Sequence, residues 1–245
     1  MKAMVLAAGL GTRLRPLTDD RPKALVEVAG RTLLELTFAR LRAFGIRDVI
    51  INTHHFADMI DAYLQSHGNF GMHIEISYEE ILLDTGGGLK RAASFFRDSD
   101  EPFLVHNVDV LSAIDFNQML QFHKDRSALA TLAVQDRSTS RYLLFDEDEQ
   151  LCGRRTGVDG KPELVRNPGM TQAFAFCGIH VLSPRIFSVM EEEGAFYIIP
   201  VYLRLAARNE TVLGYRADQY YWRDLGRPEQ IVSAAHEIEK GSYRI

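Results

Sequence analysis

Short apolar runs alternate with longer segments of helical spacing through the first half of the chain. The strand-like runs cover residues 2–8, 48–52, 73–78 and 103–107. The helix-like segments cover residues 32–44, 57–66, 85–97 and 115–126. Thr32 and Asp115 stand where helix N-caps are expected, and Gly45 stands where the first helix would end. This alternation predicts an α/β fold with a mostly parallel sheet flanked by helices, and such sheets bind ligands beyond the carboxyl ends of their strands.

The second half of the chain has shorter strands, separated by turns rich in Asp, Gly and Pro. Strands are predicted over residues 129–134, 142–146 and 174–182, and a final helix over about 228–240. We interpret these strands as an antiparallel extension of the same sheet. No repeat, low-complexity tract or linker divides the two halves, so we expect a single domain over residues 1–245.

Charge and cysteine content exclude several classes of protein. Lys and Arg total 28 against 33 Asp and Glu, a net charge of −5, so the chain has no overall attraction for nucleic acid or an acidic membrane. The first apolar run stops at Gly9, and no run approaches the roughly 20 apolar residues that a membrane span needs. Cys152 and Cys177 are too few for a disulfide framework and are expected to be buried thiols. We therefore expect a cytoplasmic protein with neither a nucleic-acid nor a membrane partner.

A loop rich in Gly and Arg follows the first predicted strand. Glycines at this place let backbone N–H groups approach phosphate oxygens, and Arg13 and Lys23 add positive charge. Leu14 breaks the dinucleotide-binding pattern G-x-G-x-x-G, and no Gly-Lys-Ser/Thr follows, so neither familiar phosphate-binding motif is present. A bare Gly-x-Gly also occurs in ordinary surface turns. The candidate nucleotide-binding residues of this loop are Ala8, Gly9, Gly11 and Thr12.

The longer string Ala-Ala-Gly-Leu-Gly-Thr-Arg-Leu-Arg-Pro-Leu-Thr, residues 7–18, resembles the signature of the sugar-1-phosphate nucleotidyltransferases when it is taken with Pro22-Lys23. The resemblance implies a Rossmann-like nucleotide-diphospho-sugar transferase fold and Mg²⁺ as the cofactor. It also implies the reaction of an NTP with a sugar-1-phosphate to give an NDP-sugar and pyrophosphate. On this resemblance Arg13 and Lys23 are the catalytic cations at the reacting phosphates.

Two carboxylates match metal-ligand positions of that family. Asp109 follows the fourth predicted strand, and Asp224 lies in a Trp-x-Asp-x-Gly segment at residues 222–226. Otherwise Asp109 would form an Asx turn or a cap, and Asp224 would pair with a neighbouring arginine. By resemblance they share one Mg²⁺, and without metal we expect two unpaired carboxylates that repel each other. Val108 replaces a family glycine, and we expect its side chain to change the substrate pocket.

Base and sugar contacts come from three further places, again by resemblance. Gly86 and Gly87 lie in a Thr-Gly-Gly-Gly turn like the nucleobase-contacting loop of N-acetylmuramate-1-phosphate uridylyltransferases and mannose-1-phosphate guanylyltransferases, which favours UTP or GTP. Asn107 and Asp136 fall where small uridylyltransferases contact the sugar phosphate. Trp222 is expected in the core rather than as a stacking surface, and residues 191–193 (Glu-Glu-Glu) as a solvated helix end.

Two other functions remain open from the sequence alone. One is a cytidylyltransferase of the same fold that acts on phosphocholine or a similar alcohol phosphate, which an aromatic pocket for a quaternary ammonium would favour. The other is a nucleotide-sensing homologue that has lost turnover, which the altered glycine at Val108 would favour. A homo-oligomer is compatible with the sequence, and neither the base nor the sugar can be read from it.

Overall fold

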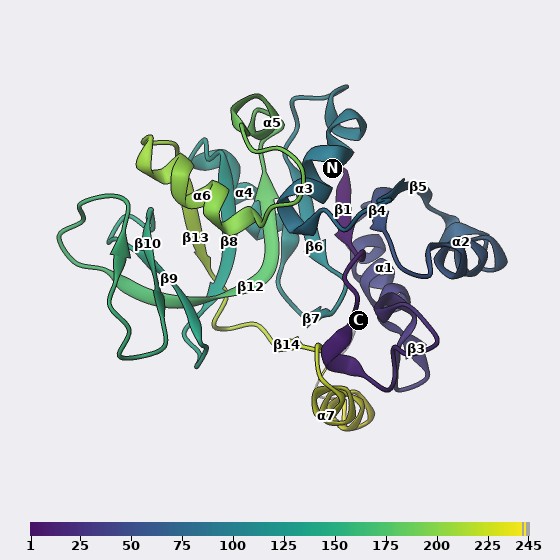
Figure 1. Ribbon diagram of the computed structural model, residues 1–245. Coiled ribbons are helices and arrows are strands. Elements are labelled where there is room, and N and C mark those ends of the chain that lie inside the picture. Colours follow the sequence, from purple (N-terminus) through teal and green to yellow (C-terminus); the bar gives the residue numbers. More distant parts are fainter. Residues whose placement is uncertain (242, 244–245) are drawn as a thin grey trace.

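The computed structural model describes residues 1–241 and residue 243, and it has a mixed ten-stranded sheet at its centre (Figure 1). The path of the sheet is β11-β10-β9-β12-β6-β1-β4-β5, and β8 pairs with β12 and with β13. The strands of this sheet are β1 (Ala3–Leu6), β4 (Asp48–Thr53), β5 (His73–Tyr78), β6 (Phe103–Asn107), β8 (Ala130–Gln135), β9 (Arg141–Phe145), β10 (Leu151–Thr156), β11 (Glu163–Leu164), β12 (Gln172–Leu182) and β13 (Val212–Arg216).

Parallel pairing dominates the first half of the chain and antiparallel pairing the second. β1 pairs in parallel with β4 and with β6, and β4 with β5. β12 is antiparallel to β6, β8 and β9, and β10 continues the antiparallel part beyond β9. The predicted α/β fold with an antiparallel extension in the second half is thereby confirmed. Two small sheets complete the strands, β2 (Glu27–Val28) with β3 (Arg31–Thr32), and β7 (Val110–Ser112) with β14 (Trp222–Asp224).

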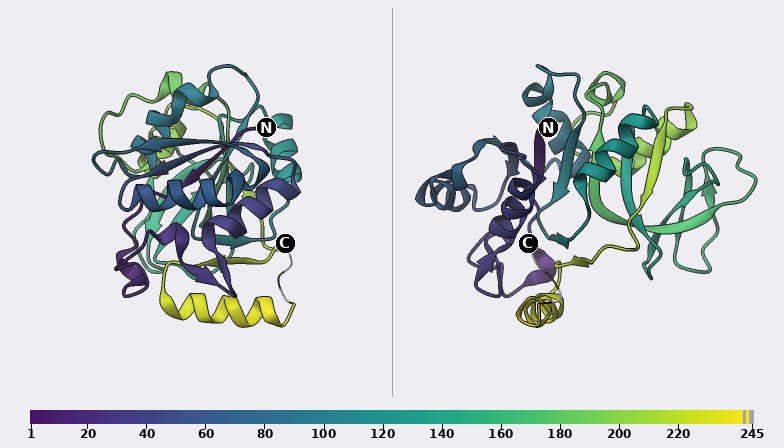
Figure 2. Two further views of the ribbon diagram at one scale, coloured as in Figure 1. Left: turned by 90° about the vertical axis from the view of Figure 1, so that its right-hand side faces the viewer. Right: turned by 180° about the vertical axis from the view of Figure 1, so that it is seen from behind.

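Helices cover both faces of the sheet, because alternate residues of its strands point into two different cores. Ala3 and Val5 of β1 belong to one core, together with residues of α1, α2, α4 and α7. Met4 belongs to the other core, with α3, α5 and α6, which lie on the near side of the sheet in Figure 1. The helices are α1 (Leu33–Ala43), α2 (Ala57–Ser66), α3 (Asp84–Arg91), α4 (Phe116–Asp125), α5 (Ile186–Val189), α6 (Ile198–Ala207) and α7 (Pro228–Glu239). Figure 2 shows α7 at the lower end of the molecule, beside the β2–β3 hairpin.

The predicted helix starts are confirmed in detail. The Thr32 hydroxyl accepts a hydrogen bond from the Glu35 N–H at 3.1 Å, which caps α1. The Asp115 carboxylate accepts from the N–H groups of Asn117 and Gln118 at 2.9 and 3.0 Å, which caps α4. Each cap satisfies backbone donors that the first helical turn leaves without a partner. The described helices include none that is long and apolar enough to cross a membrane.

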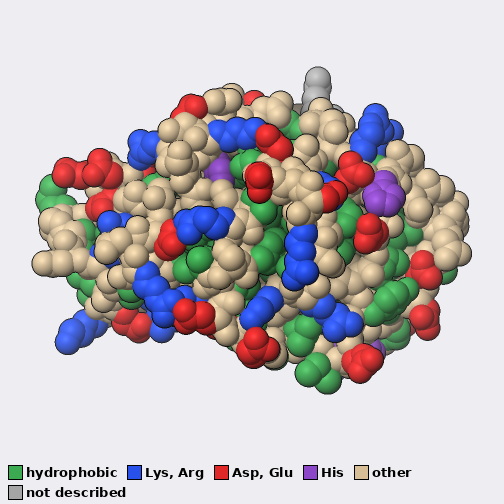
Figure 3. Space-filling view, turned by 90° about the horizontal axis from the view of Figure 1, so that it is seen from above, with side chains coloured by type: hydrophobic (Ala, Val, Ile, Leu, Met, Phe, Trp, Pro, Cys, Tyr) green, Lys and Arg blue, Asp and Glu red, His purple; other side chains and the backbone are tan. Residues whose placement is uncertain are grey.

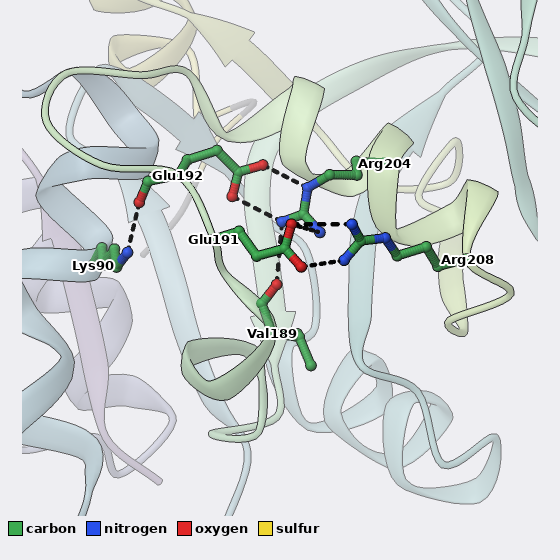
Figure 4. Close-up of polar contacts among 6 residues, drawn as sticks. All are labelled: Lys90, Val189, Glu191, Glu192, Arg204 and Arg208. Carbon is green, nitrogen blue, oxygen red and sulfur yellow. Dashed lines mark hydrogen bonds and ion pairs between the residues drawn. The ribbon is translucent and has the colours of Figure 1, made fainter.

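The acidic residues after α5 are a solvated end of that helix, as expected for Glu191 and Glu193, which are exposed, and they also form a cluster of ion pairs that the sequence analysis did not predict. Glu192 accepts two hydrogen bonds from Arg204 of α6, at 2.7 and 2.8 Å, and its backbone carbonyl accepts from Lys90 of α3 at 2.6 Å (Figure 4). Glu191 pairs with Arg208. The cluster therefore ties the segment after α5 to two helices on the same face. On the face shown in Figure 3, acidic and basic side chains are interspersed and form no large patch of one charge.

Candidate active site

One edge of the sheet collects nearly all the predicted site residues. β1, β4, β6 and β8 run in the same direction, since β6 and β8 are both antiparallel to β12. Their carboxyl ends therefore meet at one edge, the lower one in Figure 1. The glycine-rich loop follows β1, Asn107 ends β6, and Asp136 follows β8. The sheet edge is the place where such folds bind ligands.

Lys23 and Asp109 form an ion pair across this edge. The ammonium of Lys23, at the start of a 3₁₀ turn (Lys23–Leu25), donates a hydrogen bond to Asp109 Oδ2. The two side chains are only 15% and 11% exposed, so water screens the pair poorly. The expectation that Asp109 is an unpaired carboxylate is wrong, because this lysine already offsets its charge.

The structure brings Asp109 and Asp224 together on neighbouring segments. Asp224 in β14 pairs with Val110 in β7, and the Leu225 N–H donates to the Asp109 carbonyl at 2.7 Å. Asp224 Oδ1 accepts a hydrogen bond from the Gly226 N–H at 2.7 Å. Within the described chain no arginine pairs with Asp224: Arg223 pairs with Glu237, and Arg227 with Glu229. Asp224 therefore keeps its other carboxylate oxygen for a ligand.

Arg13 reaches the same place from the first loop. A Cβ built on Gly226 would lie 2.9 Å from Arg13 Nη2 and 2.7 Å from Asp224 Oδ1. Any side chain at position 226 would therefore displace one of these two groups. The segments that carry Arg13, Lys23, Asp109 and Asp224 thus meet at this edge, with Lys23 beside Asp109 and Arg13 near Asp224.

The first loop closes on itself around Gly11. Gly11 has a φ of 65°, and its carbonyl accepts hydrogen bonds from the Thr18 hydroxyl at 2.9 Å and the Leu14 N–H at 2.8 Å. A Cβ at Gly11 would lie 2.9 Å from the Thr18 methyl. Gly9 and Thr12 are exposed and Ala8 is buried. That this loop binds the nucleotide through Ala8, Gly9, Gly11 and Thr12 stays a prediction.

Gly86 and Gly87 already use the backbone donors that were expected to face a base. Both N–H groups donate to the Phe196 carbonyl, at 2.8 and 3.2 Å. A Cβ on Gly86 would collide with the Phe196 ring, and one on Gly87 with the Gly194 carbonyl. Close packing of α3 against residues 194–196 therefore explains both glycines. Their contact with a base stays a prediction, and it would have to use atoms other than these two N–H groups, which already donate to Phe196.

A buried polar chain that the sequence analysis missed connects the two glycine-rich loops. Asn52, at the end of β4, accepts from the Ala7 N–H and donates to Glu79 Oε1, each at 2.8 Å. Glu79 Oε2 accepts from the Leu83 N–H at 2.9 Å, just before α3. Glu79 is only 4% exposed. The available signal was a polar Asn within an otherwise apolar strand, which by itself does not identify a partner.

Two sugar-side predictions have different outcomes in the structure. Asn107 and Asp136 both lie at the active edge, and the Asp136 N–H donates to Asp218 Oδ1 at 2.7 Å. Their contact with a sugar phosphate stays a prediction. Val108 is 2% exposed and packs in the core that contains α1 and α4, so the expectation that it shapes the substrate pocket is wrong. The alternation of side chains along the strand end turns Val108 inward.

The expected thiols and one neighbouring histidine are neutral parts of the core. Cys152 and Cys177 are both free and buried, as predicted. Burial raises the pKa of the Cys152 thiol to about 11 and that of Cys177 to about 12. Burial also lowers the pKa of His106, beside Asn107, to about 4. None of these groups is charged near neutral pH, so the charge of the site comes from its lysine, arginines and carboxylates.

Asp109 and Asp224 could hold a metal ion that is also bound by the phosphates of a substrate. No group of three or more His, Cys, Asp or Glu side chains that could hold a metal occurs among residues 1–241 and 243. Two neighbouring carboxylates are instead present at Asp109 and Asp224. Mg²⁺ is commonly held by one or two carboxylates plus substrate phosphates and waters, and the donor set fits that arrangement.

Comparisons with known proteins agree on one family. A family model described as nucleotidyl transferase matches residues 2–241. The chain is 35% identical over 248 residues to N-acetylmuramate alpha-1-phosphate uridylyltransferase of Caulobacter vibrioides, covering 95% of this chain and 94% of that protein. It is 32% identical to mannose-1-phosphate guanylyltransferase of Mycobacterium tuberculosis, covering 98% of this chain and 65% of that protein. The chain thus spans about two thirds of the guanylyltransferase.

Solved structures share the fold at lower identity. HddC from Yersinia pseudotuberculosis complexed with GMP-PN has a TM-score of 0.77 and 20% identity, covering 97% of this chain and 99% of that one. A putative glucose-1-phosphate thymidylyltransferase from Bacillus anthracis in complex with sucrose has a TM-score of 0.80 and 17% identity, covering 96% and 94%. At this identity the likeness supports the fold.

Proposed function

The chain belongs to the nucleotidyl transferase family, and we propose that it joins an NTP and a sugar-1-phosphate into an NDP-sugar with release of pyrophosphate. The resemblance stated from the first loop is confirmed by the family match. The observation that carries the proposal is the meeting of Arg13, Lys23, Asp109 and Asp224 at one sheet edge. Relatives named for uridylyl and guanylyl transfer to sugar phosphates support it.

The residues of the edge provide what an in-line transfer needs. An oxygen of the sugar phosphate attacks the α-phosphorus of the NTP, the bond to the bridging oxygen breaks, and pyrophosphate leaves. A phosphate oxygen is already anionic at neutral pH, so no general base is required. Arg13 and Lys23 offset the charge that builds on the phosphoryl oxygens, and the loop around Gly11 orients the triphosphate.

Mg²⁺ is the proposed cofactor, and Asp109 and Asp224 are the residues that would hold it. When bound, Mg²⁺ neutralises charge on the phosphates of the nucleotide. Lys23 occupies one oxygen of Asp109 in the structure, so the ammonium and the metal would share this carboxylate or the ammonium would move to the phosphates. Binding of metal and nucleotide is therefore expected to be mutually dependent.

UTP and GTP are the proposed nucleotides, and N-acetylmuramate 1-phosphate and mannose 1-phosphate the first sugar phosphates to test, because the named relatives use those pairs. A phosphocholine-type substrate is less well supported. The Trp222 ring, a natural surface for a quaternary ammonium, is covered by the Arg137 guanidinium at 3.8 Å. A second cation would meet repulsion there. The cytoplasmic location, the single domain over 1–245 and a homo-oligomer stay predictions.

A pyrophosphate-release screen tests the proposal. Each of the four NTPs is combined with N-acetylmuramate 1-phosphate, mannose 1-phosphate, glucose 1-phosphate or phosphocholine, with Mg²⁺ or with EDTA. We expect release with UTP or GTP and one sugar-1-phosphate, and product of the matching NDP-sugar mass. Release only with CTP and phosphocholine would indicate the cytidylyltransferase. Nucleotide binding without release in any combination would indicate a sensor.

A further inference from the structure

Arg137 lies at the active edge in an arrangement that fixes its side chain. It follows β8 by two residues and is half-buried. Its guanidinium carbon lies 3.8 Å from the centre of the Trp222 ring, and Nη2 donates to the Phe176 carbonyl at 2.8 Å. The Trp222 indole N–H in turn donates to the Cys177 carbonyl at 2.8 Å. Trp222 packs against the core that contains α1 and α4, in line with the expectation, and its ring also carries the Arg137 guanidinium, which was not expected.

The charge of Arg137 is not neutralised by the protein. Within the described part of the chain no carboxylate lies at ion-pair distance from it, and its buried Nε has no hydrogen-bond partner. Arg126 and Arg216 also lie over aromatic rings, at 5.4 and 4.0 Å, and have carboxylate partners, Glu149 and Asp218 respectively. Arg40 and Arg155 are stacked on rings without an ion pair among the described residues, as Arg137 is, so what distinguishes Arg137 is its place next to Asp136 and over Trp222. Partial burial of a cation without an anion is unfavourable unless a ligand supplies the anion.

Arg137 lies next in the chain to Asp136, which the resemblance assigns to the sugar phosphate. Trp222 lies two residues before Asp224 in β14, opposite Ser112 in β7. The Phe176–Cys177 segment that holds both side chains runs into the part of β12 that pairs with β6, where Ile179 lies opposite His106, next to Asn107. Arg13 and Lys23 approach the two carboxylates from the first loop instead. Arg137 is thus held by β12 and β14, whereas Arg13 and Lys23 belong to the loop after β1.

We propose that Arg137 binds the phosphate of the acceptor substrate, the sugar-1-phosphate, with Trp222 holding the plane of the guanidinium. The inference rests on the proposed function. A planar guanidinium with free N–H donors suits two phosphate oxygens at once, and stacking on an indole leaves its edge open for such a ligand. Because the acceptor phosphate carries the attacking oxygen, this arginine also sets the direction from which it approaches the nucleotide.

Steady-state kinetics of Arg137→Met test the proposal. A hydrogen bond to a charged group contributes about 1.5 to 3 kcal/mol, which corresponds to a rise of roughly 10- to 100-fold in KM for the sugar-1-phosphate. We expect the KM for the NTP to stay within about twofold. Arg137→Lys keeps the charge without the paired donors and should recover part of the loss. Arg126→Met removes another ring-stacked arginine, remote from the edge and already ion-paired, and should leave both KM values unchanged.

A binding measurement separates failure of this inference from failure of the proposed function. Inorganic phosphate and the sugar-1-phosphates are titrated calorimetrically into wild type and Arg137→Met, and melting temperatures are recorded with and without phosphate. Without ligand, the melting temperature shows whether the variant still folds, because Arg137→Met removes the stacking on Trp222 and the hydrogen bond to the Phe176 carbonyl as well as the charge. If wild type shows no turnover in any combination but loses phosphate binding on substitution, the anion site stands and the proposed reaction fails. If wild type turns over and Arg137→Met binds and uses the sugar-1-phosphate equally well, the inference is overturned.

Discussion

Lys23 and Asp109 lie 86 positions apart in the chain and neutralise each other at the sheet edge. The pair joins the loop after β1 to the loop after β6, the two segments that were expected to bind triphosphate and metal. Without ligand, the lysine therefore occupies the carboxylate that the metal would use. Substitution of either residue has two effects, since it removes one group and leaves the other charged and without its partner.

Lys23→Ala and Arg13→Ala are each expected to lower turnover by about a hundredfold or more, the scale for removing a fixed charge from a developing anion. Their effects on stability should differ. Lys23→Ala leaves Asp109 without its ion-pair partner and is expected to cost about 1 to 3 kcal/mol of unfolding free energy. Arg13 is exposed and has no ion-pair partner among the described residues, so its removal leaves no carboxylate unpaired. Pyrophosphate release and urea denaturation measure the two quantities. Near wild-type turnover in either variant would remove that residue from the catalytic set.

Asp109→Asn and Asp224→Asn test whether the two carboxylates hold one Mg²⁺. If they do, the double variant should lose little more activity than the worse single variant, because the metal is already lost. Wild-type affinity for Mg²⁺ should rise when NTP is present. Turnover is measured for all three variants across a Mg²⁺ titration. Fully multiplicative losses, or full wild-type activity in EDTA, would show that the carboxylates do not act through a shared metal.

The parallel half of the fold could be predicted because a continuous stretch of the sequence, with its hydrophobic pattern and its capping residue, determines each of its strands and helices. β6 and α2 match their predicted ranges, and the Thr32 and Asp115 caps are formed as expected. Apart from a helix end at residues 191–193, no element was assigned between residues 183 and 227, where the structure has α5, α6, β13 and β14. Apart from Pro200 and Arg204, α6 consists of apolar residues and Tyr202, and a short apolar run of this kind cannot be told from a buried strand by periodicity alone.

The site was predicted as a set of residues and not as a set of contacts. Arg13, Lys23, Asp109 and Asp224 belong to loops whose meeting depends on strand order, and spacing along the chain carries no information on it. The Lys23–Asp109 pair, the Asn52–Glu79 chain and the stacking of Arg137 on Trp222 were all missed for that reason. Each of them joins side chains that are at least 27 positions apart.

Val108→Gly should mainly lower stability. The side chain is buried in the core with α1 and α4, so its removal leaves a cavity. Glycine also increases the backbone entropy that the chain loses on folding. We expect a loss of about 2 to 4 kcal/mol in unfolding free energy, with the ranking of sugar-1-phosphates unchanged. Denaturant unfolding and the substrate panel test this together. A changed ranking at unchanged stability would restore the interpretation of Val108 as a pocket residue.

Stability is expected to fall as the pH drops below neutral, because three histidines are buried in neutral form. Burial lowers the pKa of His106 and His123 to about 4 and that of His180 to about 3. The unfolded chain takes up these protons near pH 6.5 while the folded chain does not, so stability is full above pH 6.5 and is lost toward pH 4. Between pH 7.5 and 5.5 the loss should be about 4 kcal/mol.

Urea unfolding at the two pH values measures this loss, and His180→Gln provides the control. The variant should lose about a third less stability over the same interval, whatever its stability at pH 7.5. An equal loss in wild type and variant would mean that His180 is accessible to protons in the folded state.

Glu79→Gln tests whether the buried polar chain positions the nucleotide loops. Both Glu79 oxygens accept hydrogen bonds, from Asn52 and from the Leu83 N–H, and the amide of glutamine can replace only one of these acceptors. The unsatisfied donor should cost about 1 to 3 kcal/mol of unfolding free energy. Loosening of the loops after β1 and before α3 should raise the KM for NTP several-fold and leave that for sugar-1-phosphate unchanged.

Glu80→Gln is the matched control, because Glu80 is the exposed neighbour of Glu79 and has no hydrogen-bond or ion-pair partner in the described structure. It undergoes the same chemical change, at the same end of β5, and should leave melting temperature and both KM values as in wild type. Asn52→Asp is informative beside it, since it replaces the amide donor with a second carboxylate facing Glu79 and should lower stability more as the pH rises. If Glu79→Gln and Glu80→Gln behave alike in melting temperature and in KM for NTP, the chain from Ala7 through Asn52 to Leu83 does not position the nucleotide.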